Sequence, residues 1–134
     1  MTRPPRALRL LPGRFAVCRF EPHDPLPAWA LHDESTFWSL TRTPDELSLV
    51  CDEDALPPSV ARVEPGWRAF RVEGPIPFAE TGVLAALAAP LAAASIPLFA
   101  LSTFDTDVVL VKEGDLERAI AALAPGWRIE PAER

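Results

Sequence analysis

The chain has 134 residues, of which 49% are hydrophobic and 24% are charged, and its formal net charge is −6. A chain of this length forms one domain or two small ones, and the apolar content excludes a disordered tail. The acidic balance, with no cluster of Lys and Arg, argues against a nucleic-acid-binding protein, because such proteins neutralise phosphates with basic side chains.

No membrane-spanning or targeting segment is expected. The longest apolar stretch, residues 83–94, has 12 residues and contains Pro90, so it is too short to cross a bilayer. The N-terminal residues lack a sustained apolar core and a small-residue cleavage site, so we expect no signal peptide and a cytoplasmic location. Cys18 and Cys51 have no metal-ligand companions nearby, and we expect two buried thiols, with one disulfide as the alternative.

The first half of the chain is expected to consist of short strands joined by proline-rich loops. Residues 1–12 contain a Pro pair and are expected to form a loose leader. Residues 21–30 hold three prolines, so no long helix can pass through them. We expect a short helical turn at residues 54–56, and a chain turn at the Pro-Gly-Trp segment 65–67. Strands are expected at residues 13–20, 36–43, 46–52 and 59–64.

The second half begins with a strand and a helix. The strand is expected at residues 68–74. Residues 82–94 place apolar side chains on one broad face, which predicts a helix. Pro90 lies inside this helix and is expected to kink it.

A hairpin and a second helix follow. Two short apolar runs, residues 96–101 and 108–111, flank a polar turn and are expected to form a buried hairpin. Residues 116–123 have apolar side chains at helical spacing, and Asp115 is expected to occupy the N-cap of that helix.

An internal repeat relates the two halves. The sequence PGWR occurs at residues 65–68 and again at 125–128, a separation of 60. Sliding residues 39–54 onto 100–115 pairs apolar positions at a separation of 61, within one residue of the first. Each half therefore contains strand, hairpin and helix. We predict an α+β fold of two ferredoxin-like βαββαβ units in tandem, the first lacking its first helix. The two units are expected at residues 13–64 and 66–130.

The second half resembles an ACT domain, a small regulatory module that binds amino acids, and the fit covers residues 68–123. The segments ETGV and STFDTD lie in a longer stretch, residues 73–111, that is similar to short bacterial tandem-ACT proteins related to the CASTOR arginine sensors. Residues 41–53 look like the first ACT unit of those proteins. This resemblance implies a degenerate ACT unit followed by a complete one. Because the first unit lacks its first helix, one complete helix-start pocket is expected per chain.

The start of the helix at residues 82–94 is the first candidate site. Free backbone N–H groups and the helix dipole favour a carboxylate there, and Gly82 allows close approach to the backbone. The resemblance implies that this loop holds the amino-acid end of a ligand, with Glu80 and Val83 among the contacts. The alternative is an ordinary helix capped by Thr81 or Glu80.

The acidic turn at residues 103–107 is the second candidate. Asp105 and Asp107 could receive an ammonium or guanidinium group through charge-assisted hydrogen bonds. The alternative is that Asp and Thr are simply favourable turn residues. The resemblance implies that Thr103, Phe104 and Asp107 contact the ligand, which would lie at the seam between ACT units.

Other chemistry is not expected. His23 and His32 each precede an Asp, but no third pair of ligands accompanies them, so we expect no metal site. No Ser or Cys is accompanied by a recognisable general base, and no phosphate-binding glycine loop is present. We therefore expect that the protein is not an enzyme and binds no cofactor. The acidic charge and the repeat positions of Trp67 and Trp127 favour core or interface packing of these side chains over stacking on bases.

These observations predict a non-catalytic, cytoplasmic regulatory protein that binds an amino acid. We expect a homodimer with neither nucleic-acid nor membrane partners. The alternative is a structural interaction module of the same fold without a ligand. The sequence identifies neither the amino acid nor the effector protein.

Overall fold

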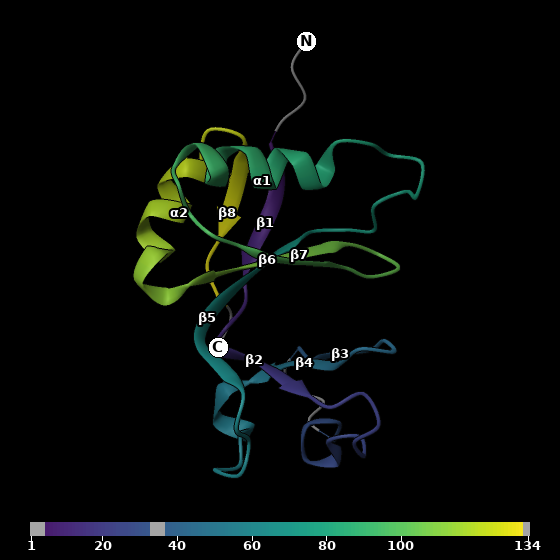
Figure 1. The fold of residues 1–134 in the computed structure, drawn as a ribbon. Helices are drawn as coiled ribbons and strands as arrows, with labels where there is room; N and C mark the ends of the chain where they lie inside the picture. The colour runs from purple at the N-terminus through teal and green to yellow at the C-terminus, as the bar shows by residue number, and fades with distance from the viewer. Residues whose placement is uncertain (1–4, 33–36, 133–134) are drawn as a thin grey trace. The chain divides into compact units, whose positions relative to one another are not determined.

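The computed structural model describes residues 5–32 and 37–132, and the chain divides into two compact units. The small unit comprises residues 13–67, and the helical unit joins residues 1–12 to residues 68–134. Eight strands and two α-helices are present in the described residues (Figure 1). The predicted α+β class is therefore confirmed.

The helical unit is a five-stranded arrangement carrying two helices. Its strands are β1 (Arg6–Leu10), β5 (Val63–Val72, which begins in the small unit), β6 (Phe99–Ser102), β7 (Asp107–Lys112) and β8 (Trp127–Glu130), in the order β6-β7-β5-β1-β8. Its helices are α1 (Val83–Ala93) and α2 (Leu116–Leu123). The hairpin, both helices and the strand before α1 were predicted from the sequence. Asp115 occupies the N-cap of α2, but its side chain makes no capping bond and instead accepts a 2.8 Å hydrogen bond from Arg118.

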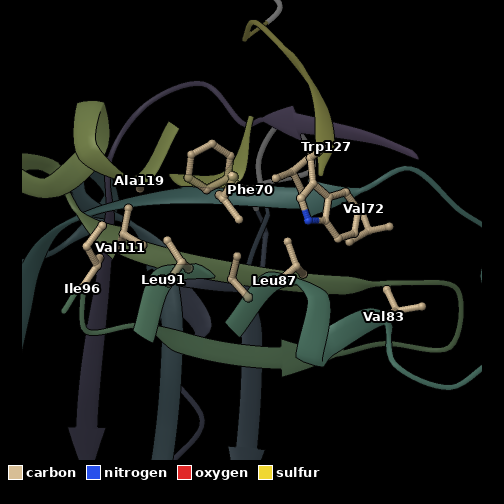
Figure 2. Packing of buried hydrophobic residues seen from close by; sticks show 12 residues of the cluster. Phe70, Val72, Val83, Leu87, Leu91, Ile96, Val111, Ala119 and Trp127 are labelled. Carbon is tan, nitrogen blue, oxygen red and sulfur yellow. The ribbon is translucent and has the colours of Figure 1, made fainter. Parts of the chain in front are cut away.

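The core of the helical unit lies between the helices and the sheet. Val83, Leu87 and Leu91 recur every fourth residue and form one buried face of α1. Figure 2 shows this face directed toward the strand that carries Phe70 and Val72, both fully buried. This packing fixes where α1 begins, and the candidate site lies at that end.

The expectation that residues 1–12 form a loose leader is wrong for residues 6–10. Arg6–Leu10 forms β1, which pairs antiparallel with β5 and parallel with β8, and Leu8 is fully buried. Pro5 precedes the strand and does not interrupt it, in a position where proline is tolerated. Both partners of β1 lie far along the chain, so the local sequence gave no sign of the pairing.

The expected turn at residues 65–67 is also wrong. Val63–Val72 is one continuous strand, and residues 59–62, expected to be strand, precede it as turn and irregular structure. Gly66 has φ +79°, and the pairing with β2 shifts register between Phe15 and Val17. A bulge with a glycine at positive φ lets a strand continue through a sequence that otherwise looks like a turn.

The small unit is built on strands. It contains β2 (Phe15–Phe20), β3 (Ser39–Arg42), β4 (Leu47–Asp52) and the first part of β5, in the order β3-β4-β2-β5. Residues 21–30 form a loop that ends in a 3-10 turn, Ala28–Ala30, and a second 3-10 turn spans Glu53–Ala55. Residues 13–32 and 37–67 contain no α-helix. Part of the strand predicted at residues 36–43 falls outside the described residues.

Two cysteines lie in the core of the small unit as free thiols, which confirms the sequence-based expectation. Cys18 and Cys51 are each 1% exposed and come from the paired strands β2 and β4. The hydrogen bond with Cys18, together with burial, raises the pKa of the Cys51 thiol. Cys51 is therefore held in its protonated, unreactive form.

The internal repeat has a separation of 60 in the hairpins. Ser39 pairs with Val50 in the β3–β4 hairpin, and Phe99 pairs with Leu110 in the β6–β7 hairpin. The turns also correspond, because the N–H of Thr43 donates to Glu46 O at 2.9 Å and that of Thr103 to Thr106 O at 2.8 Å. The separation of 61 suggested by apolar matching is off by one residue, which would reverse the faces of the strands.

Gly74 allows the loop after β5 to approach the β6–β7 turn. A Cβ atom at Gly74 would lie 2.7 Å from the carbonyl oxygen of Asp105, whereas one at Gly114 would meet nothing within 4 Å. We predict that Gly74→Ala lowers the free energy of unfolding by about 1–3 kcal/mol, as overpacking does. Gly114→Ala, the control, should change it by less than about 0.5 kcal/mol. Urea unfolding of both variants checks this, and equal midpoints would contradict it.

Candidate functional site

A pocket of about 310 Å³ lies in the helical unit, between the start of α1 and the β6–β7 turn. In Figure 1 the teal loop leading to α1 and the green turn of the β6–β7 hairpin extend to the same side. All six predicted contact residues line the pocket: Glu80, Gly82, Val83, Thr103, Phe104 and Asp107. Every residue that lines it belongs to the helical unit.

The start of α1 is open on the pocket side. Gly82 is the N-cap residue, with φ +84°, and no side chain caps the helix. The alternative that Thr81 or Glu80 caps the helix is therefore wrong. A Cβ atom at Gly82 would meet nothing within 4 Å, so its backbone is accessible. An uncapped helix start presents N–H groups and the positive end of the dipole, which suit a carboxylate.

Glu80 has a partner that the sequence did not indicate. Nη2 of Arg6 donates to both carboxylate oxygens of Glu80, each at 2.8 Å. The two side chains are 31% and 27% exposed. Arg6 belongs to β1, the strand missed in the sequence, so no local signal could have revealed this pair.

The β6–β7 turn is held together by its own polar groups. Thr103 Oγ1 accepts a 3.2 Å hydrogen bond from the N–H of Thr106. The hydroxyl of Thr106 donates to the carbonyl oxygen of Val72, which ties the turn to β5. Thr103 therefore has a structural role whether or not it contacts a ligand.

The two aspartates of the turn differ in their surroundings. Asp107 is partly buried, and its Oδ1 accepts a 2.6 Å hydrogen bond from the hydroxyl of Ser102. Asp105 is exposed, and its backbone oxygen accepts a 2.7 Å hydrogen bond from the N–H of Ile76. The backbone of Asp105 thus joins the turn to the loop that leads to α1. Of the two aspartates, Asp107 is the one whose carboxylate is oriented by a hydrogen bond.

The mouth of the pocket is apolar. Phe78 and Phe104 come from opposite walls, are 77% and 78% exposed, and meet edge to face with ring centroids 4.8 Å apart. Leu84, 40% exposed, also lines the pocket. Large apolar side chains gathered at a pocket mouth mark a binding surface. The sequence analysis identified Phe104 but missed Phe78.

A second pocket, of about 320 Å³, lies on the other side of residues 80–83. It is lined by Arg6 and Trp127 as well as by Glu80, Gly82 and Val83, which also line the first pocket. Nε1 of Trp127 donates to the carbonyl oxygen of Ala86 at 3.1 Å, and the indole is buried against α1, which agrees with the expected packing role. Residues 80–83 therefore form a wall shared by two pockets.

Metal-binding clusters and membrane-spanning helices are both absent from residues 5–32 and 37–132. No group of three or more His, Cys, Asp and Glu side chains suited to hold a metal ion occurs there. Within the same residues, no helix combines the length and the apolar character needed to span a membrane.

Family models match both parts of the chain. A model of the ACT domain matches residues 62–125, and a second model, described as an N-terminal domain, matches residues 13–59. The chain is also similar to the bovine (Bos taurus) cytosolic arginine sensor for mTORC1, subunit 1, with 37% identity over 98 residues. That alignment covers 66% of this chain and 30% of the sensor. The chain thus spans about a third of the length of the curated relatives it matches.

Solved structures agree with this relationship. A structural-genomics target from Agrobacterium tumefaciens is 40% identical, with a TM-score of 0.88 over 98% of this chain and 97% of that one. The regulatory subunit of aspartate kinase from Thermus thermophilus has the same fold, with a TM-score of 0.62 at 14% identity over 93% of this chain and all of that one. The chain therefore belongs to the ACT-domain family, as a tandem-ACT protein related to the cytosolic arginine sensors.

Proposed function

We propose that this protein is a non-catalytic amino-acid sensor whose ligand binds between the start of α1 and the β6–β7 turn. Membership of the ACT-domain family supports an amino-acid-binding regulatory role. The observation that supports this binding position is the pocket itself, which is lined by both an uncapped helix start and an oriented carboxylate. The partial positive charge of the helix start complements the carboxylate of an α-amino acid, and the negative carboxylate of the pocket complements its ammonium group.

The proposed ligand is oriented by its charges. Its carboxylate accepts hydrogen bonds from backbone N–H groups near Gly82 and Val83, which a helix start supplies without a basic side chain. Its ammonium group, or a cationic side chain, faces Asp107, whose carboxylate Ser102 orients. Phe104 covers the aliphatic part. Glu80, whose two oxygens both accept from Arg6, borders the ligand as a second acceptor.

The proposal also includes where the protein acts and how binding is reported. We place the protein in the cytoplasm and expect the ligand to report through an interface. A structural module of the same fold, with no ligand, is the competing account. The exposed pair Phe78 and Phe104 favours neither, because both a ligand and a partner protein would cover it.

The site is tested by comparing its two aspartates. Losing a buried charge partner costs about 2–5 kcal/mol of binding, so Asp107→Ala should weaken affinity by about thirtyfold or more. Asp105→Ala, the matched control from the same turn, should change affinity little, because its structural contact is made by the backbone. A thermal-shift screen against the twenty amino acids finds the ligand, and calorimetry measures both variants.

Two outcomes would contradict the proposal. If both variants bind as the parent does, the acidic turn is only a turn and the site is elsewhere. If the parent binds none of the twenty amino acids, the structural module becomes the better account.

The oligomeric state of the protein is predicted separately from the ligand site. In the helical unit β6 and β8 are the sheet edges, and β6 has no charged side chain among its residues, Phe99–Ser102. Uncharged edges tend to pair with another chain. We therefore expect a homodimer, with a mass twice the 14.6 kDa of the chain. Light scattering at high concentration checks this, and a value near 14.6 kDa would overturn it.

A further inference from the structure

We propose that Arg6 is a positioning residue for the amino-acid site, which acts by holding Glu80 and, through it, the pocket wall formed by residues 80–83. This inference rests on the proposed function for its effect on binding. Arg6 does not line the proposed ligand pocket. It lies behind the wall, in the second pocket, so any influence on the ligand has to pass through the wall.

The contact is well suited to fix the wall. One nitrogen of Arg6 donates to both oxygens of Glu80, so the carboxylate is held in orientation as well as in position. The backbone of Arg6 is placed by β8, where it pairs with Trp127, and β5 pairs with the other side of β1 from Leu8 onward. The wall is thereby joined to an interior strand of the sheet.

The segment that leads to α1 needs such an anchor. Residues 73–82 contain no helix or strand. Near the start of this segment, the N–H of Ile76 donates to Asp105 O at 2.7 Å. Near its end, Glu80 bonds Arg6, and Gly82 follows in a left-handed conformation that leaves its backbone accessible. The Arg6 contact therefore helps to place the last residues before α1, together with the hydrogen bond from the N–H of Glu80 to Pro77 O at 2.9 Å.

The charge of Arg6 matters as much as its geometry. Glu80 stands just before the helix start where the ligand carboxylate is proposed to bind. An uncompensated carboxylate at that place would repel the ligand, whereas the guanidinium neutralises it. A pair of which each side chain is about a third exposed contributes little to folding stability. Its effect should therefore be seen mainly in ligand binding.

The chain offers a matched control on the same strand. Arg9 is paired with Glu130 across β1 and β8, with both side chains 27% exposed, and neither residue lines either pocket that borders the wall. Arg6→Ala should weaken amino-acid affinity by about tenfold, whereas Arg9→Ala should leave it within about twofold of the parent, since coupling is confined to neighbouring groups. Calorimetry with the amino acid found in the screen measures both.

The double variant shows whether Arg6 acts through Glu80. If it does, adding Arg6→Ala to Glu80→Ala should cost no further affinity, because the side chain that Arg6 holds and neutralises is gone. An equal loss in both backgrounds would overturn the proposal, since Arg6 would then act on the ligand by another route. Affinity of Arg6→Ala equal to that of Arg9→Ala would overturn it as well.

A measurement without ligand separates this inference from the proposed function. Amide hydrogen exchange of Glu80 and Ala86, whose N–H groups donate to Pro77 O and Gly82 O, should be faster in the free Arg6→Ala protein than in the parent, and unchanged in Arg9→Ala. Unchanged exchange in Arg6→Ala would contradict the anchoring of the wall, whatever binds in the pocket. A parent that binds no amino acid but shows the faster exchange in Arg6→Ala would refute the sensor function alone.

Discussion

The candidate pocket depends on the close approach of two backbones at Gly74. The carbonyl oxygen of Asp105 lies where a side chain at position 74 would begin, and the same oxygen accepts the hydrogen bond from Ile76. This contact joins the loop after β5 to the β6–β7 turn. The two walls of the pocket are continuations of these segments, so their separation follows from it. Thr106 strengthens the junction from the turn, by its hydroxyl bond to Val72.

The features that could be predicted from the sequence are those set by local pattern. The β6–β7 hairpin follows from two apolar runs around a turn, and α1 follows from apolar residues spaced by four. β1 could not be predicted, because its burial depends on β5 and β8, which are distant in sequence. The site shows the same division. Its residues near α1 and the turn carry recognisable motifs, but the partner of Glu80 comes from β1, so that contact was not predictable.

The two halves of the repeat keep the hairpin and differ in what packs beside it. Asp45 and Asp105 occupy equivalent positions, and the backbone oxygen of each accepts a hydrogen bond from the preceding segment. In the helical unit the donor is the N–H of Ile76, whereas in the small unit it is the guanidinium of Arg19, 3.0 Å away. Prolines in residues 21–30 exclude a helix like α1. A helix-start pocket is therefore a property of the helical unit among the described residues.

The walls of the pocket are held in different ways, and this bears on how binding could be reported. The turn is held by backbone and buried hydroxyl hydrogen bonds, which open only with the structure around them. The wall at residues 80–83 is held partly by an ion pair whose side chains are about a third exposed. Of the two, the wall is the part that a ligand can shift at small cost in free energy. This wall also lines the pocket of Arg6 and Trp127, which belong to β1 and β8. Among the described residues, β8 is an edge strand of the sheet.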